Sequence, residues 1–350
     1  MTTANLDSAD LKGVLVGGLI REDVMNKIWD ISRIPLPFTD MVGTGSAKNE
    51  YKEWTQDTLA APDVTNAVID GSDATGNDTA TGARVGNHHQ ISSKVVRVSH
   101  RADASDTIGR AKELSYQLMR RQQELRRDVD AIALENQASV ADTGAVAGKV
   151  GGLPTWLTTN YTPRAGGAVG GFDNGGGGTT VTTAFTAATA VAALTEKEIR
   201  DRVEDAYNEG GNVSKLLTIP GLCRKISEYL FTSSARVATL MSDQGKSSEK
   251  ASALGAVNVF VTDFGTLDIV PNRLQQLQTT ATADDSAIVF YLDPEYLSLC
   301  YLEGYRTDTL GKTGLSEMRQ MSVDWSLIVH TEKAHAMSTD IDFTAAVTAT

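Results

Sequence analysis

The residue patterns that could carry out chemistry are few, and each lacks part of the motif that its chemistry requires. Asp263-Phe264-Gly265 matches the metal-holding tripeptide of protein kinases, but neither a glycine-rich loop in strand context nor a His-Arg-Asp triplet precedes it. Gly245-Lys246-Ser247 and Gly311-Lys312-Thr313 resemble the end of a phosphate-binding loop, which also needs an earlier glycine. Leu240 and Arg306 occupy the positions of that glycine. We therefore interpret the first tripeptide as a turn and assign no phosphate-binding loop.

Histidine and carboxylate patterns also fall short of a metal or catalytic site. His330 and His335 bracket Glu332, but a zinc protease motif places its two histidines one helical turn apart, whereas these lie in a strand-like run and face opposite ways. His88-His89 has no acidic neighbour at ligand spacing. The chain has no Gly-x-Ser-x-Gly elbow, and none of its carboxylates stands alone in an apolar run. The sequence predicts no catalytic residue, no cofactor-binding residue and no metal ligand.

The two cysteines and the longest glycine run are better explained by structure than by chemistry. Cys223 and Cys300 lie in apolar surroundings, which predicts buried free thiols rather than a disulfide. Gly175 to Gly178 lacks the preceding strand and following helix that a phosphate cradle requires. We interpret this run as a flexible linker.

The composition favours an acidic, folded protein. The chain has 350 residues, of which 41% are hydrophobic, and a formal net charge of −12. This charge argues against a sequence-reading nucleic-acid binder, because such a protein needs a basic surface to neutralise phosphates. No apolar run approaches the ~20 residues of a membrane helix, and no signal pattern is present. We expect a soluble protein, made in a cytoplasm.

The N-terminal part predicts an arm. Residues 1–45 look extended and irregular, with one amphipathic helix around Arg21 to Ile31. The run Ile34 to Pro37 contains two prolines, which block further helix and favour an extended path.

A long hairpin and a long helix are expected next. We expect Tyr51–Thr55 to pair with Ile91–His100, across a polar tract, Asp63–Gly86, that is too poor in apolar residues to build a core. Within the second strand, Val96 and Val98 share one face. Residues 105–136 then predict a helix, capped by Ser105, with apolar residues mostly three or four positions apart. Such a helix would be about 48 Å long and would act as a strut.

The second half predicts loops, an α/β unit and returning strands. Residues 141–195 are rich in Gly, Ala and Thr, and outside one ordered island, Gly151–Leu157, they read as surface loop. Residues 195–303 read as an α/β unit that begins with a capping box in which Thr195 caps and Glu198 reaches back. Met321 to His330 then alternates as a strand with Val323, Trp325, Leu327 and Val329 on one face.

Several stretches resemble one family of proteins. They are Glu53–Asp57, Gln90–Ser99, Glu124–Asp130, Gly152–Leu157 and Asp324–Ile341. Their order and spacing resemble the major head proteins of phage SU-ten, a branch of the capsid fold named after phage Hong Kong 97. The resemblance spans roughly residues 45–345, and the stretch from Arg164 to Ala193 departs from it.

The resemblance implies an α+β fold with an N-terminal arm, an extended loop, a peripheral domain with a long spine helix, and an axial α/β domain. The implied parts are 1–45, the arm; 46–101, the extended loop; 102–150, the spine helix; 151–194, a Gly/Ala/Thr-rich loop or insertion; 195–303, the axial domain; and 304–350, the peripheral return strands and C-terminus. Some relatives cross-link lysine to asparagine. Lys48, Lys52 and Lys94 lie in the loop region, without a local motif for that reaction.

The same resemblance implies a major capsid protein, not an enzyme, that assembles in the host bacterial cytoplasm through hexamers and pentamers into an icosahedral virion shell. Its implied partners are copies of itself, a separate scaffolding protein, a portal protein and, as a further candidate, a decoration protein. The shell would enclose double-stranded DNA without reading its sequence, and no membrane is involved. Two alternatives stay open: another self-assembling phage protein, such as a tail sheath or tube, and an unrecognised α/β enzyme centred on residues 195–303.

Overall fold

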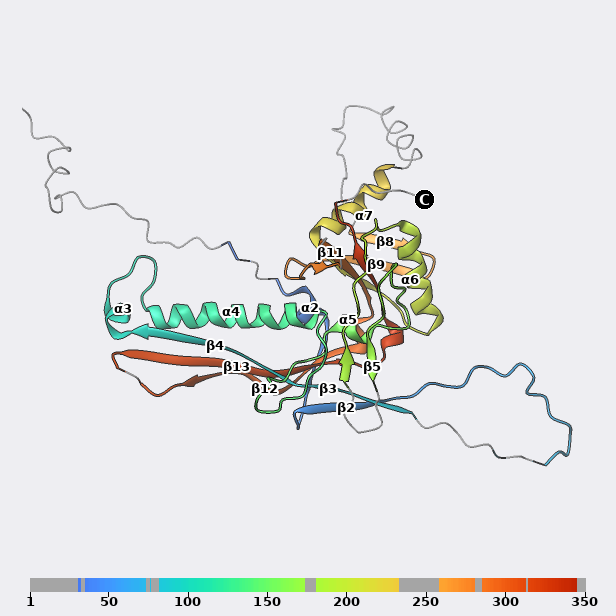
Figure 1. Cartoon of the computed structure of the whole chain (residues 1–350), viewed down its shortest axis with the longest axis horizontal. Coiled ribbons are helices and arrows are strands. Elements are labelled where there is room, and N and C mark those ends of the chain that lie inside the picture. The colour runs from blue at the N-terminus through green and yellow to red at the C-terminus, as the bar shows by residue number, and fades with distance from the viewer. Residues whose placement is uncertain are drawn as a thin grey trace, which may run out of the picture.

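The computed structural model describes residues 31–32, 35–73, 76, 82–173, 181–232, 258–280, 285–312 and 314–344. Figure 1 shows a long, narrow sheet with a helix along it, and a second sheet flanked by helices standing at one end. The amphipathic helix expected at residues 21–31 and the glycine run at 175–178 lie outside the described residues, except for Ile31.

The long sheet has four strands in the order β1-β12-β13-β4. Their bounds are Gly43–Ser46 for β1, Leu297–Thr309 for β12, Ser316–Val329 for β13 and Gln90–Ser99 for β4. The alternation predicted for β13 is confirmed, because Val323, Trp325, Leu327 and Val329 are all buried. In β4, Val96 and Val98 are buried while Val95 and Arg97 are exposed, as their alternation requires.

One face of this sheet carries the helix α4, Glu113–Ala133. Leu114 packs against Val96 and Val98, and Leu125 and Val129 enter the main core. The predicted apolar stripe is therefore real over most of its length. At 21 residues, the helix is about 32 Å long.

The predicted start of this helix is wrong. Ser105 does not cap it: a separate short helix, α3 at His100–Ala104, has Ser99 as its N-cap and Ser105 as its C-cap. The chain then turns through Gly109, whose φ of 76° lies in the left-handed region that favours glycine. This turn interrupts the helical path and leaves Ile108 exposed outside α4.

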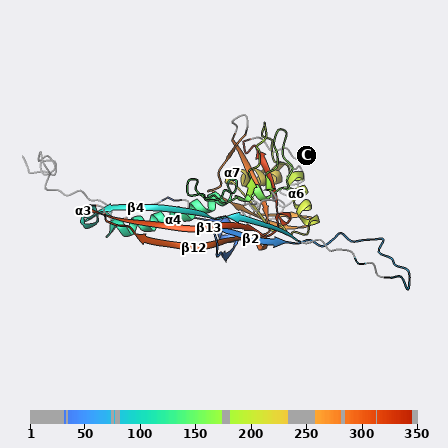
Figure 2. The same cartoon turned by 60° about the horizontal axis from the view of Figure 1, so that its bottom comes forward.

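The hairpin exists, but its second strand was assigned wrongly. β2, Tyr51–Gln56, pairs with β3, Ala83–His88, and not with residues 91–100, which form β4 of the long sheet. The two strands β3 and β4 follow each other almost without a break at His89. Figure 2 shows the hairpin running on beyond the end of the long sheet.

The second sheet has the path β10-β11-β7-β9-β8, with β14 paired to β11. The bounds are Gln278–Thr279 for β10, Asp285–Leu292 for β11, Lys215–Thr218 for β7, Gly265–Pro271 for β9, Val259–Thr262 for β8 and Ala336–Ile341 for β14. Its helices are α6, Glu196–Asn208, and α7, Pro220–Thr232. Short 3-10 turns at Pro294–Tyr296 and Glu332–Ala334 connect it to the long sheet.

Local signals in this part are largely confirmed. Thr195 accepts a hydrogen bond from the Glu198 amide at 3.1 Å, as a cap should. The Glu198 side chain, however, takes Arg164 as its partner at 3.0 Å. Asp263 and Phe264 form the turn between β8 and β9, as expected. The boundary expected at residue 303 falls inside β12, and β14 lies in the second sheet rather than with the return strands.

Residues 151–194 are more ordered than the composition suggested. The short helix α5, Leu153–Trp156, is wholly buried, and β5, Gly171–Asp173, pairs with β6, Val181–Thr183. Phe185, Ala188 and Leu194 are also buried, so the interpretation of this tract as surface loop is wrong for these residues. A few large side chains, spaced far apart, fix a glycine- and alanine-rich segment to the core.

The N-terminal expectation also needs a correction. Pro37 begins a short helix, α2 at Pro37–Met41, because proline fits the first turn, where its missing amide is not needed. Phe38 in this helix is fully buried in the main core. The following β1 pairs in parallel with β12.

Candidate assembly surfaces

The root of the hairpin is fixed to the long sheet by a buried amide. Asn87, at the end of β3, donates to the Leu327 carbonyl at 2.9 Å and accepts from the Gly151 amide at 2.8 Å. Gln56, at the loop end of β2, donates to the His330 carbonyl at 2.8 Å, so the far end of the hairpin is fixed as well. The paired strands are thus held against the body at both ends, and the loop that follows them leaves from a fixed position.

A histidine next to this root joins three distant segments. His89 Nδ1 lies 3.0 Å from Asp324 Oδ1, and its Nε2 lies 3.7 Å from Cys300 Sγ. Burial lowers the pKa of His89, partly offset by Asp324, and Lys52 lowers it further. The sequence could not reveal this contact, because Asp324 lies 235 positions away.

Cys300 contacts His89, which contacts Asp324, and this arrangement resembles that of a catalytic cysteine. Catalysis by cysteine requires a thiolate with access to a substrate. Cys300 is fully buried, and burial raises the pKa of its thiol to about 11. Cys300 and Cys223 are both free, and the latter is only half-buried, so the expectation of two buried thiols holds fully for Cys300 alone. The cluster is a structural contact between β12, β13 and the hairpin root.

The other patterns singled out from the sequence are dispersed by the fold. His330 Nε2 lies 3.1 Å from Ser298 Oγ. The Glu332 carboxylate accepts hydrogen bonds from the backbone amides of Thr158 and Thr159. His335 is fully buried, and its Nδ1 accepts a hydrogen bond from the Asp293 amide instead. Within the described part of the chain, no group of three or more His, Cys, Asp or Glu side chains is placed to hold a metal ion. Nor is any helix of that part both long and apolar enough to cross a membrane.

The loop beyond the hairpin exposes apolar side chains. Leu59, Val64, Val68 and Ile69 are between 83% and 99% exposed, and their segment has no helix or strand. Figures 1 and 2 both show this segment running away from the body. A monomer rarely gathers several such side chains without a partner to cover them.

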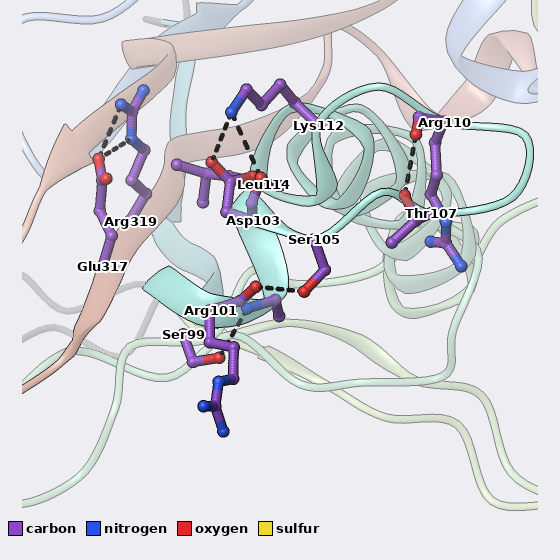
Figure 3. Close-up of polar contacts among 11 residues, drawn as sticks. Ser99, Arg101, Asp103, Ser105, Thr107, Arg110, Lys112, Leu114, Glu317 and Arg319 are labelled. Atoms are coloured by element: carbon purple, nitrogen blue, oxygen red, sulfur yellow. Dashed lines mark hydrogen bonds and ion pairs between the residues drawn. The ribbon is translucent and has the colours of Figure 1, made fainter.

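The opposite end of the long sheet is tightly organised. Asp103 of α3 accepts the Leu114 amide at 3.1 Å, so it caps α4 from outside, where the N-cap residue Lys112 makes no side-chain cap. Lys112 also reaches Asp103, with its Nζ 3.7 Å from Oδ2. Figure 3 shows these contacts together with the Ser105–Arg101 hydrogen bond, which closes α3.

A groove lies at this end between the strand β4 and the helix α4. Its volume is about 260 Å³. It is lined by Val95, Val96, Arg97, Val98 and Ser99 of β4, by Ala102, and by Glu113, Gln117 and Arg121 of α4. Since β4 ends the strand order, one wall of the groove is a sheet edge.

A buried carboxylate ties α4 to two other parts. Asp130 accepts hydrogen bonds from the Thr39 amide at 2.9 Å, the Thr39 hydroxyl at 2.7 Å and the Asn272 amide group at 3.1 Å. Its side chain is fully buried, so these donors replace the water that it loses. The arm, the helix and the second sheet therefore meet at one residue.

Comparison with known proteins places the chain in a family. A model of the SU10 major capsid protein family matches residues 2–342. The chain belongs to the SU10 major capsid protein family. Members of this family are structural proteins of the phage virion and not enzymes.

A curated relative agrees with this membership over part of the chain. The chain is 38% identical over 102 residues to the major capsid protein of Escherichia phage Phieco32. This match spans 29% of the chain and 29% of the length of that relative.

Solved structures show the fold. The capsid of the cyanophage P-SCSP1u has a TM-score of 0.55 at 14% identity, covering 95% of this chain and 98% of that one. The capsid of a native GTA particle gives 0.55 at 12% identity, covering 97% and 100%. The holo-SrpI encapsulin complex from Synechococcus elongatus PCC 7942 gives 0.53 at 11% identity, covering 93% and 95%. The fold is therefore the Hong Kong 97-like capsid fold, as the sequence predicted.

Proposed function

We propose that this capsid protein assembles through hexamers and pentamers into an icosahedral shell that encloses double-stranded phage DNA. The observation that carries this proposal is the projecting hairpin, whose loop exposes Leu59, Val64, Val68 and Ile69 almost completely. Such a surface becomes buried only against another molecule. Many copies in closed symmetry provide that burial with a single gene product.

The parts of the fold take distinct roles in this proposal. The long sheet and α4 form the peripheral domain, and the second sheet with α6 and α7 forms the axial domain around the five- and six-fold axes. The hairpin and its loop lie over a neighbouring subunit. The boundaries first expected were 102–150, 195–303 and 304–350. In this proposal, the peripheral domain includes β12 from Leu297 onward, and the axial domain includes β14.

The charge of the chain suits a container. A net charge of −12 leaves the shell with no general affinity for phosphate, so DNA can be enclosed without being bound tightly. A separate scaffolding protein, a portal protein and a decoration protein are the further partners in this proposal.

The test is co-expression of the chain with the scaffolding protein of its phage, followed by electron microscopy of the particles. We expect closed icosahedral shells with pentamers and hexamers. Tubes would favour a tail protein instead, and subunits that stay monomeric under every assembly condition would refute the proposal. As a control, truncation of the loop between residues 58 and 72 should leave the subunit folded but unable to form shells.

A further inference from the structure

We propose that the solvent-facing side of α4 binds the phosphate backbone of the enclosed double-stranded DNA through Arg120, Arg126 and Arg127. This inference rests on the proposed function, which places DNA inside the shell. It adds a local binding site that the net charge of the chain, −12, does not suggest.

The three arginines lack an acidic partner. Arg120 and Arg126 are exposed, and Arg127 is half-buried. None of the ion pairs between described residues includes any of the three. Because an α-helix turns once every ~3.6 residues, Arg120 and Arg127 lie about 10 Å apart on one side of α4, with Arg126 beside them. Figure 1 shows this helix lying along one side of the long sheet.

The acidic residues of α4 are already engaged and do not neutralise these arginines. Each of the four has a partner of its own within the described part of the chain. The partners are Arg110 for Glu113, Arg121 for Glu124, Lys94 for Asp128, and Thr39 with Asn272 for Asp130. The solvent-facing side of the helix is therefore positive, although the chain as a whole is negative.

Aromatic rings hold two of the arginines in place. Arg126 Cζ lies 5.3 Å from the centre of the Tyr305 ring, and Arg120 Cζ lies 6.0 Å from the centre of the Tyr116 ring. A ring contact uses the face of a guanidinium and leaves its N–H donors for other acceptors. Because these side chains are already ordered, binding a phosphate costs them less entropy than it would cost a free side chain.

The other side chains on this side favour a nucleic acid over a protein as the occupant. Ser115, Gln122 and Gln123 are polar, and Met119, 51% exposed, is the one large apolar side chain that α4 exposes. Protein–protein interfaces need an apolar core, whereas protein–DNA interfaces are more polar and more positive. The guanidinium group also matches the oxygens of a phosphate with two parallel N–H donors.

Three free cations predict weak binding that does not depend on base sequence. A duplex carries one charge per roughly 1.7 Å of its axis, so phosphates face α4 along its whole length. Each neutralised phosphate contributes about −0.9 to the slope of log K against log salt, which gives about −2.7 for three. Phosphate contacts carry no sequence information. Weak contacts repeated on every copy would hold the outer layer of DNA and still allow its release.

The test is binding of a labelled duplex of random sequence, about one to two helical turns long, to the unassembled subunit. Fluorescence anisotropy at several salt concentrations, from about 50 to about 200 mM, gives the affinity and its salt slope. We expect the parent to lose affinity about 40-fold over that range, as a slope of about −2.7 requires. Replacing Arg120, Arg126 and Arg127 by Gln should lower the affinity at low salt at least tenfold and bring the slope close to zero.

A matched control removes the same charge elsewhere. Arg84, Arg200 and Arg306 are also partly exposed, but each pairs with a carboxylate, Glu53, Glu196 and Glu303 respectively. Replacing these three by Gln changes the net charge equally and should leave the affinity within about twofold. Circular dichroism checks that both triple variants fold. Arg120→Gln alone, at an exposed position, should reduce the size of the slope by about 0.9 if the triple variant does not fold.

Several results would overturn the inference. They are a parent that does not bind the duplex at low salt, an equal loss in both triple variants, and competition by poly-glutamate as strong as that by unlabelled duplex, which would make an acidic protein segment the occupant. Binding that appears only after residues 1–30 are removed would show that the arm covers this side of α4, and would overturn it too.

The assembled particle provides a second test. In intact shells of a Cys223→Ser background, Met119→Cys should be protected from a bulky thiol reagent that labels it in the dissociated subunit, because a surface that binds DNA must line the interior. Equal labelling of shells and subunits would place this side of α4 outside and overturn the inference. Shells formed by a parent that does not bind the duplex would leave the capsid function standing, whereas failure of the parent to form any shell would refute the proposed function itself.

Discussion

Acid should destabilise the isolated subunit through one buried histidine. His335 is fully buried where the two sheets join, and its Nδ1 accepts the Asp293 amide at 3.1 Å. Burial is the main reason that its pKa is lowered to about 4. A proton on Nδ1 would turn this acceptor into a donor facing another donor, so protonation and folding oppose each other.

The sign and size of the effect follow from linkage. Because the pKa is lower in the folded chain than the ordinary value of 6.5, the unfolded chain takes up the proton first as the pH falls. The stabilisation is complete above pH 6.5 and is lost as the pH falls towards 4. The difference between the two pKa values corresponds to about 3 kcal/mol. Burial also lowers the pKa values of His88, His89 and His330, which adds a loss of the same sign.

The measurement is urea unfolding of the unassembled subunit at several pH values between 7 and 4. The control is His335→Asn, whose side-chain oxygen can accept the Asp293 amide but does not titrate. We expect the wild-type subunit to lose about 3 kcal/mol more than this variant over that range. Parallel pH profiles for the two proteins would refute the reasoning, because every other titrating group is common to both.

Four substitutions, one of them a control, test the packing and hydrogen bonding of the core. Gly152→Ala should prevent folding or cost several kcal/mol, because a Cβ there would lie 1.9 Å from the Glu135 carbonyl oxygen. The control Gly45→Ala should be tolerated, because the nearest atom to its Cβ would be 3.8 Å away. Thermal melting of the two variants compares their stabilities. Asp130→Ala should cost about 2 kcal/mol in urea unfolding by leaving buried donors without an acceptor, and a loss below 0.5 kcal/mol would contradict this. Trp325→Ala should cost about 3–5 kcal/mol, since the ring is fully buried in the main core, and unchanged unfolding would contradict that packing.

Several features that depend on local periodicity or capping were predicted well, although the cap assigned to Ser105 was wrong. The alternation in β13, the apolar stripe of α4 and the Thr195 cap were all correct, because each signal lies within a few neighbouring residues. The overall order of arm, hairpin, helix and mixed unit was also recognisable, through the resemblance.

Features that depend on distant partners could not be predicted. β3 reads as Ala-Arg-Val-Gly-Asn-His, with no alternation, and is a strand because β2 and the Asn87 contacts hold it there. The start of α4 is determined by Asp103 of α3, whose capping contact is tertiary. His89 gains its acidic partner only when β13 is in place.

The pairing of β4 with β13 also has a consequence for biosynthesis. Arg97 of β4 and Ser316 of β13 are hydrogen-bonded across 219 positions of the chain. At the ribosome's pace of about 5–20 residues per second, β13 emerges roughly 10–45 s after β4. Throughout that interval β4 has an open edge on both sides, so nascent chains on neighbouring ribosomes are exposed to mutual strand exchange before any one of them is complete. The edge of β4 that pairs with β13 is therefore covered only late in synthesis, after most of the chain has emerged.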